Sequence, residues 1–565
     1  MQAGTRGRPN ANILIVGESY GAEEARQQKP FIGMSGVELD KMLMEAGIDH
    51  TNCYFTNVVN ARPANNDMKN FFFTTKEAKE HNMTPIRGLY PGPEVIEGII
   101  KLQELIEQLQ PKIIIGFGNY ALWALTEDSF KVSNSEGKKI PTGITNYRGS
   151  QLSSRFGNIP FLPTYHPAAC LRQWPWRYQV VHDLRARVRK AFTNDWDEPE
   201  RNFIIRPTLD QVLSCLNNLI LRAELSSVPL LVTCDIETHS KHTECIGFGW
   251  SKTDAICIPL MCSDKWEGYW EAWEEVEVIL AIKKVLEHPN LEITGQNFFY
   301  DMQFFNHYHF THPNYKQDTM LAHHVCFPGT PMGLDYLSSL YCSFHRYWKD
   351  DGKEAAKQHN DEERWVYNCR DCVVTFEVME ALWNVIRHYG LERQYAIQMI
   401  RARSSLPMMY KGVAIDAARQ GEEKIKQIHA EMEYGNRLEE MIPVSVWPRE
   451  KTPWYRSPIQ QARLFYDELG VREVKDPKTG NRTTNDDALK KIGRRELILK
   501  PVTDALAEYR SLSTFGQFVN MKLSSDRRMR ASFSPTTETF RYRSSADVFG
   551  FGRNLQNLPT GNEDE

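Results

Sequence analysis

The sequence lacks any apolar stretch near the ~18–20 residues that a membrane-spanning helix needs, so no membrane partner is expected. Its opening residues, MQAGTRGRPNAN, lack the apolar segment of a secretory signal. Its 11 cysteines are odd in number and have no framework spacing, which favours reduced thiols in a cytoplasm over secreted disulfides. It also lacks strong net charge: the balance is −4, so any contact with DNA must rely on local positive charge.

Strand and helix patterns alternate over the first two thirds of the 565 residues. In residues 1–192, the runs "NILIVG", "PKIIIGFG" and "IPFLPTYHPAA" predict buried strands, and "PEVIEGIIKLQELIEQLQ" predicts an amphipathic helix. A polar, proline-containing run predicts a linker at 193–204, and a second α/β pattern covers 205–394. Over 395–565 the pattern predicts helices and no strands. The predicted fold class is multidomain: two α/β domains and a mostly α domain.

Acidic side chains follow predicted strands in the second region. "CDIET" places Asp235 and Glu237 two residues apart on a buried strand, so both carboxylates face the same side. Asp301 follows another predicted strand, and Tyr367 and Asp371 lie i, i+4 on one predicted helix. Buried carboxylates repel one another unless a cation lies between them.

Four carboxylates and a tyrosine are the groups that two-metal phosphodiester hydrolysis requires. Oxygen ligands hold two Mg²⁺ or Mn²⁺ ions roughly 3.5–4 Å apart, one activating water and the other stabilising the leaving oxygen. Tyr367 would orient the attacking water. A lone C-x-x-C, "CRDC", does not predict zinc, because no second Cys or His pair is near it.

The ordered motifs D-x-E, N-x3-D and Y-x3-D resemble those of the DnaQ-like 3′–5′ exonucleases, which proofread for DNA polymerases and have an RNase H-like fold. The resemblance implies a Mg²⁺-dependent removal of nucleotides from single-stranded 3′ ends. It also implies a residue assignment: Asn297 contacts the substrate, and the metal ligands are Asp235, Glu237, Asp301 and Asp371.

The third region is basic, with 14 Lys or Arg against 8 Asp or Glu over residues 482–553, a balance that is also typical of a solvated helical face. "MMYKGVAIDAA", "LAEYRSLSTFGQFV" and "RMRASFSPTTETFRYRSSADVFGFGRNLQNLP" resemble the thumb of family A (DNA polymerase I-like) enzymes. The resemblance implies that Arg541, Arg543, Asn554 and Gln556 contact primer–template duplex, mainly at phosphates. Where the family has T-G-R-L-S-S, this sequence has "TFRYRSS" and lacks the glycine. Either Arg541 or Arg543 therefore takes the place of the family's arginine.

The palm and fingers motifs of that family do not follow the thumb-like region. We therefore expect no nucleotidyl transfer by this chain alone. Two explanations stay open: a naturally split, phage-type polymerase whose palm and fingers are a separate partner chain, or a truncated gene.

The first region resembles the uracil-DNA glycosylase superfamily. Its motifs stand as "GESYG", "PFIG", "TNVVNARP" and "HPA". The resemblance implies that Phe31 stacks on a flipped uracil, that Asn57 reads its edge, that His166 stabilises the departing anion and that Glu18 positions or activates water. Tyr20 replaces the family's proline beside Glu18 and would reshape the pocket.

The motifs resemble most the bacterial and archaeal type of this superfamily, whose members hold an iron–sulfur cluster on four cysteines. This region has only Cys53 and Cys170, and Ala61 stands where a ligand cysteine should be, so no cluster is expected. Uracil excision and a glycosylase fold kept only to grip DNA both stay open. The main hypothesis for the whole chain is a DNA replication and proofreading enzyme, and the alternative is a non-catalytic DNA-binding processivity or assembly subunit.

Overall fold

The computed structural model describes residues 5–127, 130–263, 267–310, 313–477 and 480–557. The end of the predicted thumb-to-palm junction, residues 558–565, lies outside them. The chain divides into two compact units: Met1–Asp301 with Phe310–Met399, and Met302–His309 with Ile400–Glu565. No helix within the described ranges is both long and apolar enough to cross a bilayer.

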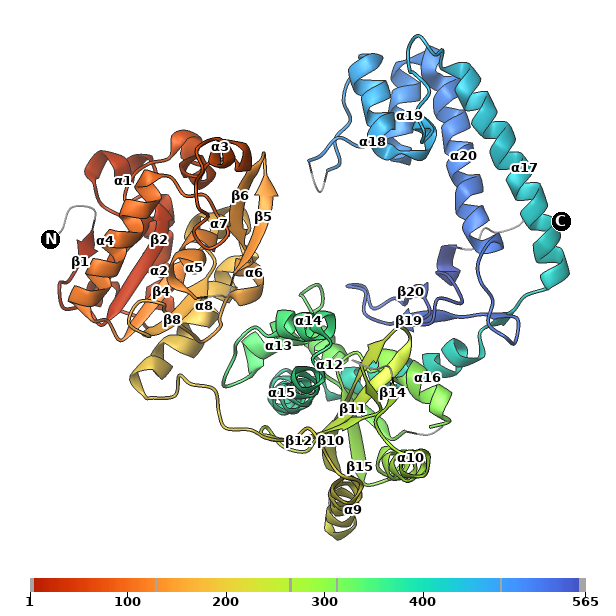
Figure 1. The fold of residues 1–565 in the computed structure, drawn as a ribbon, viewed down its shortest axis with the longest axis horizontal. Helices are drawn as coiled ribbons and strands as arrows, with labels where there is room; N and C mark the ends of the chain where they lie inside the picture. Colours follow the sequence, from red (N-terminus) through yellow and green to blue (C-terminus); the bar gives the residue numbers. More distant parts are fainter. Residues whose placement is uncertain (1–4, 128–129, 264–266, 311–312, 478–479, 558–565) are drawn as a thin grey trace. The chain divides into compact units, whose positions relative to one another are not determined.

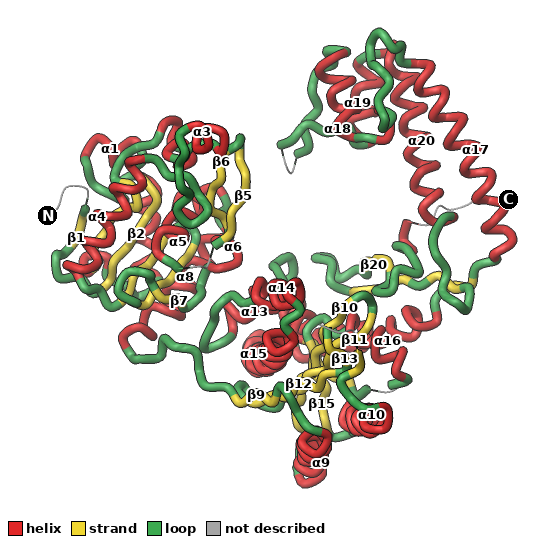
Figure 2. The backbone as a smooth tube through the Cα atoms, viewed as in Figure 1, coloured by secondary structure: helices red, strands yellow, loops and turns green. Residues whose placement is uncertain are grey.

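A six-stranded mixed sheet of order β1-β3-β2-β4-β8-β7 is the centre of the first domain (Figures 1 and 2). Its four inner strands are parallel, and short antiparallel strands flank them at the edges. The carboxyl ends of parallel strands meet at one edge of a sheet, so the residues that follow β2, β3 and β8 come together. The strands are β1 (Arg6–Gly7), β2 (Ile13–Ser19), β3 (Cys53–Val59), β4 (Ile113–Phe117), β7 (Leu152–Ser153) and β8 (Pro160–Thr164).

Amphipathic helices pack around this sheet. In α4 (Pro93–Leu109), the proline takes the first turn, where its missing N–H costs nothing, and Val95, Leu102 and Ile106 bury the face that contacts β3. A hairpin is formed by β5 (Lys131–Ser135) and β6 (Lys138–Thr142). The other helices are α1 (Ala22–Gln27), α2 (Met34–Glu45), α3 (Thr75–Glu80), α5 (Asn119–Leu125), α6 (Ile144–Tyr147), α7 (Pro167–Arg172) and α8 (Pro175–Arg187).

The second domain is built on a sheet of order β16-β15-β10-β11-β12-β9. Strands β10, β11 and β12 are antiparallel neighbours, while β15 runs parallel to β10. The β10–β11 ladder shifts register between Glu237 and Thr238, and such a bulge re-aims side chains. The strands are β9 (Asn202–Ile204), β10 (Leu230–His239), β11 (His242–Gly249), β12 (Asp254–Pro259), β15 (Leu291–Gly295) and β16 (Tyr315–Asp318). Strand β9 lies within the predicted linker, and the domain boundaries stay predictions.

The long helix α15 (Asp361–Tyr389) packs on β10, β11 and β12. Asn360 caps its start by accepting from Glu363 N at 3.3 Å, and Gly390, with φ 63°, ends it. A Cβ at Gly247 of β11 would lie 2.2 Å from Asn368 Oδ1, so this glycine lets the helix approach the sheet. The remaining helices of the domain are α9 (Leu209–Leu225), α10 (Ala272–Leu286), α12 (Thr319–Cys326), α13 (Leu334–Tyr341) and α14 (Lys349–Gln358). Two further helices, α11 (Phe299–Phe305) and α16 (Glu392–Lys411), have residues in both compact units.

The second unit is mostly helical, and its long helices α17 (Ala417–Met441) and α20 (Lys500–Val519) run side by side (Figure 1). The shorter α18 (Pro458–Ala462) and α19 (Asp486–Arg495) belong to the same unit. The multidomain fold class is confirmed, but the expectation of no strands after residue 395 is wrong. Two antiparallel pairs form there, β17 (Val413–Ala414) with β18 (Arg528–Met529), and β19 (Ala531–Ser534) with β20 (Arg543–Ala546). These strands are too short and too polar to show an apolar alternation.

Candidate functional site

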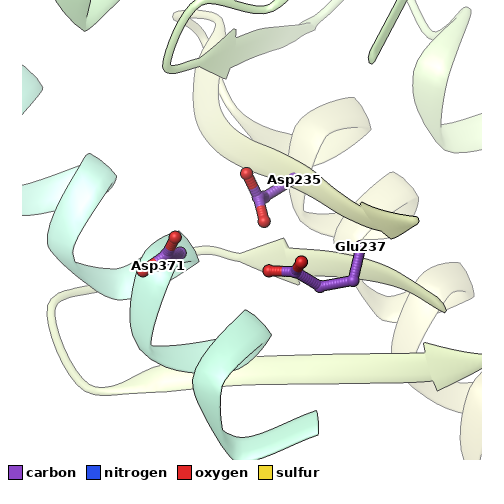
Figure 3. A group of neighbouring side chains, drawn as sticks. All are labelled: Asp235, Glu237 and Asp371. Atoms are coloured by element: carbon purple, nitrogen blue, oxygen red, sulfur yellow. The ribbon is translucent and has the colours of Figure 1, made fainter. Parts of the chain in front are cut away.

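Three of the four predicted metal ligands converge in the second domain (Figure 3). Asp235 and Glu237 come from β10 and Asp371 from α15, and one carboxylate oxygen of each lies within 4.8 Å of the others. Asp371 is buried, whereas Asp235 and Glu237 are half-buried and so remain reachable from solvent. Alternation along the strand and the close approach of α15 bring them together.

Asp301 does not join this group of three. It lies in the first turn of α11, and its Oδ1 accepts from Ile236 N at 3.0 Å, between the two acidic residues of β10. Asn297 precedes the same helix with φ 57°, and its backbone N donates to Asp318 Oδ1 at 3.2 Å. Asp301 therefore lies beside the carboxylate group and supports the backbone of β10, whereas the printed contact of Asn297 is with Asp318.

Sequence reasoning missed four polar residues that contact the predicted ones. Arg364 pairs with Glu237 at 2.7 Å, and Asn368 donates to Asp235 Oδ2 at 3.0 Å. Both share a helical face with Tyr367 and Asp371, so the i, i+3, i+4, i+7 spacing was a usable signal. Trp348 Nε1 and Lys349 Nζ donate to the two oxygens of Asp371, each at 2.6 Å. These two carried no such signal, because they come from the start of α14.

The electrostatics of the group favour a cation. Burial, and then the charges of Asp371, Glu237 and Asp301, raise the pKa of Asp235 well above its usual value. Burial also raises the pKa of Glu237 to about 7, although Arg364 opposes this shift. Close, partly desolvated carboxylates of this kind fit Mg²⁺ or Mn²⁺, which prefer oxygen ligands.

Tyr367 adds a hydroxyl to the site. Its OH accepts from Lys349 Nζ at 2.9 Å, and burial raises the pKa of the phenol above its usual value, so it stays protonated. Burial lowers the pKa of Lys349, but the charges of Asp371 and Tyr367 outweigh it and raise that pKa overall. The site thus contains a neutral phenol and a charged ammonium group beside the carboxylates.

A separate cavity of about 210 Å³ lies in the first domain. Pockets for drug-sized ligands measure ~300–1,000 Å³, so this smaller cavity suits a ligand with one small ring. The Phe31 and His166 rings stack in it with centroids 6.2 Å apart, and Phe31 has φ 54°. All five residues predicted for this site line the cavity: Glu18, Tyr20, Phe31, Asn57 and His166.

Two groups in this cavity have shifted protonation. Burial raises the pKa of Glu18 to about 7, against the opposing hydrogen bond from Tyr120 N at 3.3 Å. Burial lowers the pKa of His166 to about 4, so its ring is neutral at pH 7. Because His166 Nδ1 accepts from Ala168 N at 3.2 Å, its proton is on Nε2, which can donate to a ligand.

Tyr20, Cys53 and Cys170 are three further buried residues of the first domain whose polar groups bear on its predicted function. The Tyr20 hydroxyl is buried and has no hydrogen-bond partner within the described ranges, a costly state that a ligand could relieve. Burial raises the pKa of the Cys53 thiol to about 12 and that of Cys170 to about 11. Their thiols therefore stay protonated.

The predicted duplex-binding residues lie together on the β19–β20 hairpin and the segment after it. Arg541 and Arg543 are exposed. Gln556 joins the two segments, accepting from Ser544 N at 3.2 Å and donating to Tyr542 O at 2.8 Å. Asn554 Oδ1 accepts from Gln556 N at 2.9 Å. The glutamine and asparagine thus shape the loop, while the arginines are available to a partner.

Comparisons with known proteins identify both α/β domains. Residues 5–188 match the uracil DNA glycosylase superfamily, and residues 213–387 match a family described as 3′–5′ exonuclease. A Type-4 uracil-DNA glycosylase of Thermotoga maritima is 32% identical over 166 residues, 29% of this chain and 69% of that protein.

Two longer proteins are also similar. A DNA polymerase of Bacillus phage SP01 is 22% identical over an alignment 595 positions long, which covers 91% of this chain and 59% of the polymerase. The solved POL domain of Pol1 from M. smegmatis, in complex with DNA primer-template and dNTP, shares 18% identity and a TM-score of 0.46. That match covers 64% of this chain and 57% of the POL domain chain.

Proposed function

The chain belongs to the uracil DNA glycosylase superfamily, and with its 3′–5′ exonuclease match this leads us to propose a DNA replication and proofreading enzyme that trims 3′ ends. The observation that carries the proposal is the convergence of Asp235, Glu237 and Asp371 beside Tyr367. Similarity to a phage DNA polymerase over most of the chain supports a place in DNA replication or repair. The substrate we propose is a single-stranded 3′ end, reached from primer–template duplex.

Each residue of the site has a proposed part in phosphodiester hydrolysis. A divalent cation on Asp235, Glu237 and Asp371 would neutralise charge at the phosphate and make a bound water more acidic. Tyr367 orients the attacking water through its phenol. Asn368 fixes the rotamer of Asp235, and Arg364 holds Glu237 in place. Asp301, also a predicted metal ligand, supports β10 by accepting a hydrogen bond from Ile236 N.

The test is digestion of a 3′-labelled single-stranded oligonucleotide with Mg²⁺. We expect the wild-type chain to release terminal nucleotides and chelation of the metal to stop it. Asp235→Ala with Glu237→Ala should lower the rate by roughly 100-fold or more, because both remove charge-stabilising ligands. Glu380→Gln is the matched control, since Glu380 lies on α15 and pairs only with Lys252 at 3.0 Å among the contacts described. Equal rates for the double variant and the wild type would refute the proposal.

A second activity, uracil excision, is favoured by the cavity of the first domain. A neutral His166 donor, a stacking Phe31 and a half-buried Glu18 are the groups that extrusion and cleavage of a base require. A uracil-containing oligonucleotide should gain an alkali-labile site, and His166→Ala should remove most of this activity. His81→Ala, at an exposed position of the same domain, is the control. If a Type-4 glycosylase cleaves the oligonucleotide and this chain does not, excision is excluded.

The first domain is proposed to fold without an iron–sulfur cluster. Residues 1–192 contain two cysteines, too few for the four-cysteine ligand set of the relatives. Iron and acid-labile sulfide analysis of protein purified without oxygen should find neither. Stoichiometric iron would overturn this point.

The third region is proposed to be a family A thumb that binds duplex through Arg541 and Arg543. The exposed Arg541 and Arg543 of the β19–β20 hairpin support this role. The competing function is a non-catalytic processivity subunit. That function requires salt-sensitive duplex binding to survive loss of the acidic and cavity residues while neither reaction is detected.

A further inference from the structure

The segment that joins α13 to α14 docks into the first α/β domain, which belongs to the same compact unit. Arg187 of α8 is almost fully buried and donates to the backbone oxygens of Ser339, Cys342 and Ser343, at 2.5–3.1 Å. Gln151 N donates to His345 O at 2.7 Å. The backbone of this segment is therefore fixed by donors from the first domain.

Tyr347 is the anchor of the segment. It is 5% exposed and belongs to the hydrophobic core of the first domain, where its ring lies 4.9 Å from that of Tyr147. Its backbone N donates to Ser150 Oγ at 3.2 Å, and its OH accepts from Asn146 Nδ2 at 3.2 Å. Asp350, three residues on, pairs with Lys131 at 3.0 Å. Anchors thus lie on both sides of residues 348 and 349.

Those two residues are the ones that reach the carboxylate site. Trp348 and Lys349 together occupy both oxygens of Asp371, and Lys349 also contacts the Tyr367 hydroxyl. The backbone of α14 touches the Tyr367 ring, because a Cβ at Gly352 would lie 2.5 Å from it. Two groups central to the proposed hydrolysis are therefore placed by a segment that the first domain holds.

We propose that Lys349 is a positioning residue of the exonuclease site and that the first domain is the scaffold that keeps it there, an inference that rests on the proposed exonuclease function. An ammonium group only donates, so the Tyr367 oxygen must accept from it. The phenolic hydrogen is then directed away from Lys349 and is available to the attacking water. The same ammonium group fixes the orientation of the Asp371 carboxylate.

The first experiment measures Lys349→Ala, Lys349→Arg and, as a control, Lys353→Ala in the full chain. Lys353 lies one turn further along α14 and its side chain is 71% exposed. Lys349→Ala should lower kcat at least about 10-fold with little change in KM, Lys349→Arg should restore part of it, and Lys353→Ala should match wild type. Tyr367→Phe combined with Lys349→Ala should cost less than the product of the single effects, because the lysine acts partly through the phenol.

Calorimetric Mn²⁺ binding gives a readout that does not depend on turnover. A positioning lysine predicts Mn²⁺ affinity within a few-fold of wild type in Lys349→Ala. Tighter Mn²⁺ binding together with equal or higher activity would show that the lysine competes with the cation, and would overturn the inference. Unchanged kcat in Lys349→Ala would also overturn it.

The scaffold is tested by Tyr147→Ala, with Tyr178→Ala as the control on an exposed tyrosine of the same domain. Tyr147→Ala should lower exonuclease kcat and speed hydrogen exchange over residues 345–358. If that variant does not fold, Lys131→Ala with Asn146→Ala removes the two polar anchors outside the core. If either of these variants folds and keeps the wild-type kcat and the wild-type rate of hydrogen exchange over residues 345–358, the first domain is not the scaffold. If the wild type itself does not digest 3′ ends, the proposed function fails instead, so the two failures are distinguishable.

Discussion

Two glutamates have a pKa of about 7, and they reach it in different surroundings. Glu18 is raised by burial, with a backbone donor as the main opposing group, whereas Glu237 is raised by burial against the full charge of Arg364. Glu18 therefore has no cation in hydrogen-bond contact among the described residues, while Glu237 sits in a group of charges. A carboxyl that changes charge near neutral pH can work as a base there.

The Glu18 shift predicts how stability depends on pH. Its pKa is raised from 4.5 to about 7, so between these values the folded state holds a proton that the unfolded state has lost. Stability therefore falls as pH rises through this window, by up to about 3 kcal/mol from this group. Glu18→Gln should remove that contribution. The thermal unfolding midpoint of the variant, relative to that of the wild type, should therefore increase as pH rises from about 5 to about 8. Parallel midpoint curves for the two proteins would contradict the assignment.

The rate of uracil excision should also depend on the ionisation of Glu18, but it should rise with pH whereas the stability falls. If Glu18 acts as a base, the rate of uracil release should rise as pH increases through about 7, because the carboxylate is the active form. His166 stays neutral over that range, since its pKa is about 4. The measurement is a single-turnover rate at several pH values. A rate that falls from pH 6 to pH 8 would exclude Glu18 as the base.

At the scale of elements, one helix and one bulged strand determine the carboxylate site. Asp371 reaches Asp235 because α15 lies directly on β11, where Gly247 has no side chain to separate them. The bulge after Glu237 shifts the register of the β10–β11 ladder directly after a residue that we propose to hold the cation. The geometry thus depends on helix–sheet distance as well as on the acidic residues.

Gly247→Ala tests that dependence. The added Cβ would lie 2.2 Å from Asn368 Oδ1 and 2.8 Å from Cys372 Sγ, so α15 must move away. We expect a loss of about 1–3 kcal/mol in stability and a fall in exonuclease rate. Gly421→Ala in α17 is the matched control, because nothing lies within 4 Å of its Cβ, and it should gain about 0.5–1 kcal/mol. Equal stability and rate for Gly247→Ala and wild type would refute the packing argument.

The sequence was informative where a short-range pattern specified the structure. Apolar runs located β2, β4, β8 and β10, and helical spacing placed Tyr367 beside Asp371. It could not reveal Trp348 and Lys349, because their place depends on a docking contact with residues about 200 positions earlier. Nor did it show that Asp301 would bond to Ile236 N, since a motif gives the order of residues but not their rotamers.

At the scale of the whole molecule, charge is distributed unevenly. The net charge is −4, yet the described part of residues 482–553 is basic and includes the exposed Arg541 and Arg543. Such local charge can bind phosphates although the net charge of the chain is negative. Affinity for duplex should then depend steeply on salt.

Arg541→Ala with Arg543→Ala should weaken duplex binding at every sequence alike. If each arginine contacts one phosphate, the slope of log affinity against log salt should become shallower by about 2. Lys426→Ala is the control, because this lysine of α17 is 71% exposed and pairs with Glu423. Fluorescence anisotropy across a salt series measures the slope. An unchanged slope would place the duplex elsewhere on the protein.

The buried guanidinium of Arg187 has a consequence for how the chain comes apart. If the first domain separated from residues 339–343, Arg187 would lose three backbone acceptors and Tyr347 would leave the core of the first domain, and both losses oppose separation. The two α/β domains should therefore unfold in one calorimetric transition. A protease that cuts within residues 193–201 should leave a nicked protein whose two pieces elute together. Residues 1–192 expressed alone should melt at a lower temperature than the same residues in the intact chain.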